Sequence, residues 1–296
     1  MDLPQVKGKL EKDYPLKKLN TWRIGGLGEL VFWPKDINEL VNVVKWCKNQ
    51  NKEKPLLLLG RGSNVLLPDE GFKGLVIVDT ELRGITWQED MVSCEAGYSL
   101  MCLAREAASR GLGGLEFACG IPGTVGAAIA INAGAHGEEI GKLVKDVKVL
   151  TPEGEISILP SEDISFEYRK SSLVEKGYFI LESALRLDPG GESVVIRERM
   201  NDLLAKRRIT QPLEYPNAGS VFRNPPGNSA GRLIEQAGWK GRRIGDAQVS
   251  EKHANFIVNR GNAKSEEILR LILEIKKDIS AKFGIELETE ISVITG

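Results

Sequence analysis

The sequence predicts an α+β fold, in which helices and strands both occur but do not alternate regularly. Some segments carry apolar residues at helical spacing, and others are short apolar runs that stop at glycine or proline. The order of these segments lacks the regular crossovers of a doubly wound sheet. A chain of 296 residues also exceeds one ordinary core, so we expect two or three lobes.

The first half of the chain is predicted to contain two helices and three short strands. Leu40, Val43 and Cys47 recur three and four residues apart and indicate the first helix. Ser99 is a candidate cap for the second helix, and Gly111 is a candidate end. The expected elements are helices over 39–49 and 100–110 and strands over 56–59, 75–78 and 91–96.

The second half begins with a hairpin and ends with a helix and a strand. Pro152, Glu153 and Gly154 form a turn between two apolar segments, which is a hairpin signature. The expected elements are strands over 144–150, 155–159, 179–187 and 285–293, a helix around 196–204 and a helix over 265–283. In the last strand, apolar residues alternate with glutamates, so we expect carboxylates on one face.

Turn-forming residues suggest how the chain divides. Residues 188–191, Asp-Pro-Gly-Gly, form the best linker in the sequence, and we place a domain boundary there. The expected lobes are 1–75, 76–190 and 191–296.

Composition and charge limit the function classes. The chain has 40 Lys and Arg against 41 Asp and Glu, a net charge of −1, which weighs against a nucleic-acid partner. The first twenty residues lack the apolar stretch of a secretory signal, and no apolar run is long enough to span a membrane. We therefore expect a cytoplasmic protein without a membrane or obligate protein partner.

Cysteine and histidine are too sparse for most metal sites. The four cysteines form no C-x-x-C pair, and the only histidines are His136 and His253. We therefore expect no metal and no multi-histidine centre.

Glycine carries the strongest compositional signal. It makes up 32 of 296 residues, about 11% against an average near 7%, and nine glycines fall between Gly111 and Gly141. Concentrations of this kind occur where backbone turns sharply or approaches a ligand closely.

The first glycine segment follows the run of leucines at 56–59. Residues 60–64, Gly-Arg-Gly-Ser-Asn, offer consecutive backbone N–H groups with a hydroxyl and an amide, which suits a pyrophosphate. The segment is neither a P-loop nor G-x-G-x-x-G. Taken alone, an ordinary tight turn explains it about as well as a phosphate cradle.

The second glycine segment spans 120–135, and nearly every side chain from Gly123 to Ala135 is small. Such backbone can pack against a large flat ligand such as an isoalloxazine ring. The alternative is a tightly packed helix–loop junction in the core, which this segment alone would favour.

Together the two segments resemble the FAD-binding half of the vanillyl-alcohol-oxidase-like flavoproteins. The opening N-T-W-R-I-G-G at 20–26 is similar to that of one family within them, UDP-N-acetylenolpyruvoylglucosamine reductase (UDP-N-acetylmuramate dehydrogenase). Further matches follow in that family's order: S-F-E-Y-R-K-S at 165–171, A-G-S-V-F-R-N-P at 218–225, A-G-R-L-I at 230–234 and V-S-E-K-H-A-N-F at 249–256. The length resembles the shorter, type II form.

The resemblance implies a fold and a reaction. The fold is a two-lobed FAD-binding module followed by a C-terminal α+β substrate-binding domain. In the reaction, NADPH reduces FAD, and flavin N5 then delivers hydride to C3 of the enolpyruvyl ether of UDP-N-acetylglucosamine. Protonation at C2 yields UDP-N-acetylmuramate, a precursor of peptidoglycan in the cell wall.

Three catalytic positions are implied by the resemblance. Arg169 would hold the substrate carboxylate as negative charge develops, because its guanidinium stays protonated. Ser220 would protonate C2, and Glu290 would help to hold the enolate, best as a protonated hydrogen-bond donor. Without the resemblance, these residues would be read as a surface arginine, a turn serine and a solvent-facing glutamate.

The resemblance also implies binding residues. Those for FAD are Gly60, Arg61, Gly62, Ser63, Asn64, Gly120, Ile121, Pro122, Gly123, Thr124, Gly126, Ala127, Asn132, Ala133 and Gly134. Those for substrate are Tyr168, Asn224, Lys240, His253 and Arg208, with Arg207 as an alternative to Arg208 for the diphosphate. The chain departs from the family pattern at Ala127, Val221 and Ser292, where glycine, an aromatic residue and arginine are common.

Two other functions fit some of these features. One is an oxidase of the same superfamily that returns electrons to O₂. The other is a protein that binds a flavin or nucleotide without catalysis.

Overall fold

The computed structural model describes residues 5–49 and 55–295 and confirms the α+β class. Its contacts divide the chain into two compact units. Unit 1 comprises 1–11, 31–61 and 75–206, and unit 2 comprises 12–30, 62–74 and 207–296. The three lobes expected from the sequence stay a prediction.

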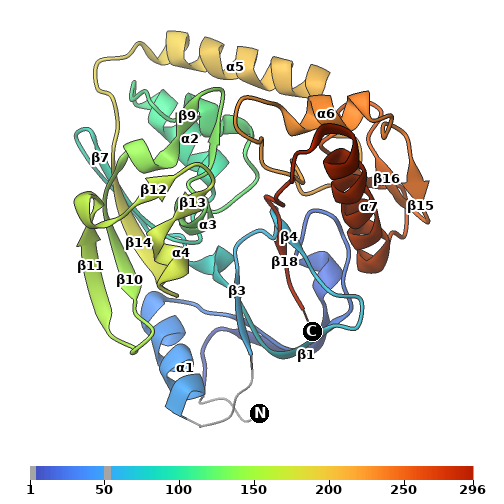
Figure 1. Ribbon diagram of the computed structural model, residues 1–296. Coiled ribbons are helices and arrows are strands. Elements are labelled where there is room, and N and C mark those ends of the chain that lie inside the picture. Colours follow the sequence, from blue (N-terminus) through green and yellow to red (C-terminus); the bar gives the residue numbers. More distant parts are fainter. Residues whose placement is uncertain (1–4, 50–54, 296) are drawn as a thin grey trace. The chain divides into compact units, whose positions relative to one another are not determined.

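A five-stranded antiparallel sheet forms the centre of unit 1, in the order β11-β10-β14-β7-β6 (Figure 1). Its strands are β6 (Ile85–Gln88), β7 (Met91–Glu95), β10 (Val144–Leu150), β11 (Ile156–Pro160) and β14 (Phe179–Arg186). Helices α2 (Leu100–Ser109) and α3 (Val125–Ala130) share one apolar core with this sheet. The predicted hairpin is therefore confirmed as the β10–β11 pair.

A four-stranded sheet has the order β1-β2-β5-β3. Its strands are β1 (Lys9–Pro15), β2 (Leu27–Trp33), β3 (Leu56–Leu59) and β5 (Phe72–Val78). Strands β3 and β5 are parallel, with Leu59 opposite Val78, so Gly60 and Asp79 follow at the same edge. Helix α1 (Ile37–Asn49) confirms the first predicted helix.

Helix α7 (Ser265–Phe283) dominates unit 2, and its bounds are those predicted from its apolar stripe. It lies against a small sheet of β15 (Arg243–Ile244), β16 (Ala247–Val249) and β17 (Ile257–Asn259), as Figure 1 shows. Trp22, fully buried, belongs to the same core as Ile268 and Leu271. The tryptophan of the opening motif therefore has a packing role in unit 2.

The remaining elements are short, apart from α5 (Ser193–Thr210). The strands are β4 (Val65–Leu66), β8 (Gly134–Ala135), β9 (Glu138–Glu139), β12 (Phe166–Glu167), β13 (Lys170–Ser171) and β18 (Ser292–Val293). The helices are α4 (Ser172–Glu175) and α6 (Ala230–Gln236), with 3₁₀ turns at Leu16–Lys18, Asp79–Glu81, Glu116–Gly120, Ile140–Lys142 and Ser161–Asp163.

One local prediction is wrong, and a second is confirmed only in part. The strand expected over 285–293 is reduced to β18, because the segment before it pairs only irregularly, with residues 221–223. Ser99 is the N-cap residue of α2, as predicted, but its side chain accepts no hydrogen bond from the helix backbone. Its hydroxyl instead accepts a hydrogen bond from Nη1 of Arg61 at 3.3 Å.

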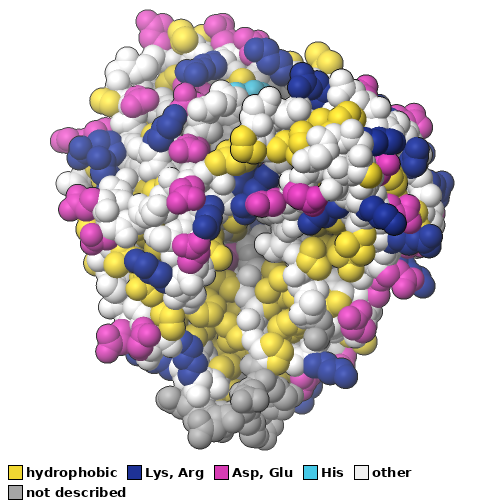
Figure 2. Space-filling view, viewed as in Figure 1, with side chains coloured by type: hydrophobic (Ala, Val, Ile, Leu, Met, Phe, Trp, Pro, Cys, Tyr) yellow, Lys and Arg dark blue, Asp and Glu magenta, His cyan; other side chains and the backbone are white. Residues whose placement is uncertain are grey.

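The surface carries charges of both signs. Figure 2 shows basic and acidic side chains interspersed over the visible face. In the part of the chain that the structure describes, no helix is both long and apolar enough to cross a membrane. The same residues contain no group of three or more potential metal ligands from His, Cys, Asp and Glu.

Candidate active site

The loop after β3 is shaped by the absence of side chains at its two glycines. A Cβ added to Gly60 would lie 2.5 Å from Oγ1 of Thr124, and one added to Gly62 would lie 2.1 Å from the carbonyl oxygen of Leu19. Gly62 also has a φ of +60°, a left-handed conformation that other residues adopt at a cost. Glycine is therefore required at both positions.

The same loop presents donors without protein acceptors. Among the described residues, none accepts a hydrogen bond from the backbone N–H groups of residues 61–64. The carbonyls of Gly62 and Asn64 are instead held by the N–H groups of Thr21 and Ser292, at 3.1 and 2.9 Å. A fixed loop with a run of open N–H groups has the character of an anion-binding nest and fits a pyrophosphate.

The second glycine segment is closely packed. Gly126 donates its N–H to the carbonyl of Ala96 at 2.8 Å, and a Cβ there would lie 2.6 Å from the Ala96 Cβ. Thr124 caps α3 by accepting a hydrogen bond from the N–H of Ala127 at 3.4 Å. Close packing in the core thus accounts for Gly126.

Gly60, the first residue of the loop after β3, lies beside the start of α3 within unit 1. The Cβ added to Gly60 would be 3.3 Å from the Cβ of Ala127, besides its contact with Thr124. One dinucleotide can therefore contact Gly60 and the start of α3 together. The residues present fit FAD.

Arg169 occupies a strained turn between β12 and β13. It has a φ of +58°, and its Nη2 donates to the carbonyl of Gly134 at 2.6 Å. Asn132, fully buried, supports this turn, because its Nδ2 donates to the carbonyl of Glu167 at 2.9 Å and its Oδ1 accepts from the N–H of Gly141 at 3.0 Å. Both polar atoms of the Asn132 side chain therefore bond to backbone. The FAD contact predicted for Asn132 would be made by its main chain.

Ser220 and Glu290 lie on neighbouring segments of unit 2. The N–H of Glu290 donates to the carbonyl of Val221 at 2.8 Å, and the N–H of Arg223 donates to the carbonyl of Glu288 at 2.9 Å. Both Ser220 and Glu290 are half-buried. The structure thus brings together two of the three predicted catalytic residues although they are far apart in the sequence.

The predicted substrate residues of unit 2 include a cation, Lys240, and an imidazole, His253. Lys240 pairs with Glu235 at 2.6 Å, and its charge together with burial lowers the pKa of His253, with burial as the larger cause. Nδ1 of His253 accepts the N–H of Asn255 at 3.3 Å, so the neutral ring carries its proton on Nε2. A neutral imidazole can therefore donate to an anion.

The other predicted substrate residues differ in how firmly they are held. Asn224 is exposed, and its Oδ1 accepts the N–H of Ala230 at 3.0 Å. Arg208 is exposed, whereas Arg207 is half-buried. In unit 1, Tyr168 is exposed. The guanidinium carbon of Arg169 lies 5.0 Å from the centre of the Tyr168 ring.

Two buried polar residues were missed in the sequence. Asn255 bonds to the backbone next to Ser220, and its place in the H-A-N-F segment was the available signal. Asp79 is 3% exposed, and within the described residues no group donates a hydrogen bond to its Oδ1. Burial raises the pKa of Asp79 to about 7.

Comparison with known proteins covers nearly the whole chain. A family model described as the C-terminal domain of UDP-N-acetylenolpyruvoylglucosamine reductase matches residues 211–294, and a model described as an FAD binding domain matches 28–159. UDP-N-acetylenolpyruvoylglucosamine reductase 2 of Symbiobacterium thermophilum is 43% identical over 97% of this chain and 92% of its own length. The Moorella thermoacetica reductase is 44% identical over 99% and 98%.

A solved structure agrees with these relatives. The crystal structure of the reductase from Thermus caldophilus superimposes with a TM-score of 0.82 at 34% identity, covering 98% of this chain and all of that one. The chain therefore belongs to the UDP-N-acetylenolpyruvoylglucosamine reductase family of FAD-dependent oxidoreductases.

Proposed function

We propose that this protein uses NADPH, through bound FAD, to reduce the enolpyruvyl ether of UDP-N-acetylglucosamine to UDP-N-acetylmuramate in the cytoplasm. The observation that carries the proposal is the contact of the two glycine segments at Gly60, Thr124 and Ala127, which suits one dinucleotide. Whole-length relatives named as this reductase support the choice of substrate.

FAD would be held by backbone more than by charged side chains. The open N–H groups of residues 61–64 would bind its pyrophosphate, and the small residues from Gly123 to Gly134 would lie along its ring. When bound, the flavin accepts hydride from NADPH and supplies it to C3 of the substrate.

The protein's own task is to manage charge and a proton. The Arg169 guanidinium would bind the substrate carboxylate, where negative charge grows after hydride addition. Ser220 would give its hydroxyl proton to C2, and the Glu290 carboxyl would hold the enolate oxygen. The pairing of the Ser220 and Glu290 segments is consistent with two groups acting on one small fragment.

The diphosphate would be bound in unit 2. Lys240 and Nε2 of His253 are the candidate donors, because an ammonium and the N–H of a neutral imidazole can both donate to phosphate oxygens. Asn224 and Arg208 are further candidates, exposed on the same unit.

Stopped-flow kinetics of Ser220→Ala tests the proposed acid. Reduction of the flavin by NADPH should be unchanged, while anaerobic reoxidation by the enolpyruvyl substrate should slow by roughly 10² to 10⁴-fold. An unchanged reoxidation rate would contradict the role of Ser220.

The wild-type protein, reduced and then mixed with aerated buffer, separates the alternative functions. An oxidase would be reoxidised rapidly by O₂ and would not need the enolpyruvyl ether. A folded, colourless protein that takes up no added flavin would favour the non-catalytic binding function.

A further inference from the structure

We infer that Asn255 is a positioning residue for Ser220, and that its buried amide takes the place of a neighbouring strand. The inference rests on the proposed function of Ser220. It concerns a residue that does not itself touch the reacting atoms.

Asn255 holds the three peptide groups that follow Ser220. Its carbonyl oxygen accepts the N–H of Val221 at 2.8 Å. Its side-chain Oδ1 accepts the N–H of Phe222 at 2.9 Å, and its Nδ2 donates to the carbonyl of Phe222 at 2.8 Å. The side chain thus pairs with Phe222 as a peptide group of an adjacent strand would.

The opposite edge of this segment is held as well. The carbonyl of Val221 accepts the N–H of Glu290 at 2.8 Å. Nδ2 of Asn64 in turn donates to the carbonyl of Glu290 at 3.1 Å. An asparagine side chain is therefore hydrogen-bonded to each of the two paired segments. Asn255 bonds to the segment that follows Ser220, and Asn64 bonds to the backbone of Glu290.

This arrangement explains how such short segments can hold catalytic groups. Residues 219–223 and 285–291 form no regular strand, so they lack a continuous ladder to fix them. Asn255 is 4% exposed, which shields its hydrogen bonds from water. Misplacing a reacting group by about 1 Å can cost about 10²-fold in rate, so a fixed backbone at Ser220 has kinetic value.

Asn259 provides a matched control. It lies in the same unit, is 3% exposed and makes three backbone hydrogen bonds of 2.9 to 3.0 Å. Its partners are Trp22, Gly261 and Ala263, so its substitution disturbs the core of unit 2 without touching the Ser220 segment.

The test compares Asn255→Asp with Asn259→Asp in the FAD-loaded protein. The carboxylate introduced at 255 can still accept from Phe222 N–H but cannot donate to Phe222 O. Thermal stability, flavin content, both half-reactions and the solvent deuterium isotope effect on reoxidation are measured for each variant.

For Asn255→Asp, flavin content and the rate of reduction by NADPH should stay within about threefold of wild type. Reoxidation by the enolpyruvyl substrate should slow by about 10²-fold, with a larger solvent isotope effect, because proton transfer from a misplaced Ser220 becomes slower. Lowering the pH should partly restore the rate, since the protonated carboxyl regains a donor. Asn259→Asp should lose stability without any of these selective changes.

The inference is overturned if Asn255→Asp slows both half-reactions equally, slows neither, or behaves like Asn259→Asp. Should Asn255→Asp fail to fold, hydrogen exchange of the wild-type Phe222 amide decides instead. Strong protection of this amide supports the inference, and exchange at the rate of an unprotected amide refutes it. If wild-type protein itself is not reoxidised by the enolpyruvyl substrate, the proposed function has failed and not this inference.

Discussion

The buried carboxyl of Asp79 should make unit 1 less stable as the pH rises. Asp79 directly follows β5, is 3% exposed, and has a pKa raised from 3.8 to about 7 by burial. The folded protein therefore retains a proton that the unfolded chain releases above pH 3.8. Below that pH both states are protonated, and above about 7 the folded state carries the full cost of a buried charge.

The size of the effect follows from the two pKa values. A difference of one in pKa corresponds to about 1.36 kcal/mol, so the rise from 3.8 to about 7 amounts to about 4 kcal/mol. Asp79→Asn removes the ionisation and keeps a neutral polar group. The free energy of unfolding of the variant minus that of wild type should therefore rise by about 1.4 kcal/mol per pH unit between about pH 4 and 7 and then level off.

Urea unfolding of both proteins between pH 4.5 and 8, followed by circular dichroism, measures this difference. Asp246→Asn is the control, since hydrogen bonds from the Asn262 N–H and Arg243 lower the pKa of Asp246 from 3.8. Both the folded and the unfolded state carry this carboxyl ionised between pH 4.5 and 8, so the difference between wild type and Asp246→Asn should be constant over that range. A difference between Asp79→Asn and wild type that is constant over the whole range would refute the buried-acid interpretation.

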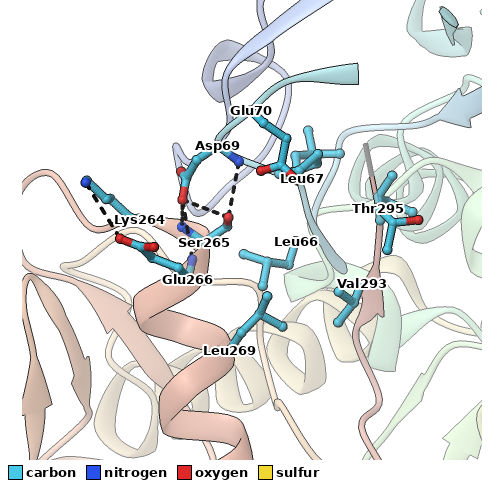
Figure 3. A pocket seen from close by; sticks show the side chains of 12 residues that line it. Leu66, Leu67, Asp69, Glu70, Lys264, Ser265, Glu266, Leu269, Val293 and Thr295 are labelled. Atoms are coloured by element: carbon cyan, nitrogen blue, oxygen red, sulfur yellow. Dashed lines mark hydrogen bonds and ion pairs between the residues drawn. The ribbon is translucent and has the colours of Figure 1, made fainter. Parts of the chain in front are cut away.

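Two further predictions concern the flavin loop and the long C-terminal helix. Gly60→Ala should abolish flavin binding, measured by absorbance of the purified protein, because its Cβ would collide with Thr124 at 2.5 Å; Gly113→Ala, with no neighbour closer than 3.5 Å, should keep the flavin. A yellow Gly60→Ala protein would count against the proposed cofactor site. Asp69→Ala should lower the free energy of unfolding by about 1 to 2 kcal/mol in urea titrations. Its Oδ2 accepts the N–H and hydroxyl of Ser265 at 2.7 and 2.8 Å and so caps α7 beside a cavity of about 430 Å³ (Figure 3); an unchanged midpoint would show that the cap adds nothing.

Predictions from local pattern were accurate where one face of an element is uniformly apolar. Helix α7 has the predicted bounds because Ile268, Leu271, Ile275 and Ile279 recur at helical spacing and are all buried. The strand expected over 285–293 failed although its alternation was equally regular. There the backbone partners come from a distant irregular segment, which alternation cannot reveal.

The functional residues of the loops could also be predicted only in part. Residues 60–64 were recognised as a candidate pyrophosphate site because glycine spacing is a local property. Asn255 was overlooked, since an asparagine that imitates a strand looks like any other asparagine until its partner is known. Asp79 was overlooked for a similar reason, because burial depends on the packing of the whole unit.

The sequence by itself determined four helices, six strands, the two glycine segments and the family, because these depend on residues close together or on motifs in a fixed order. Tertiary structure alone decided that Gly60 packs against Thr124 and that the backbone next to Ser220 is hydrogen-bonded to that of Glu290. Such contacts join residues distant along the chain, and their free energy is realised only when the whole core has formed.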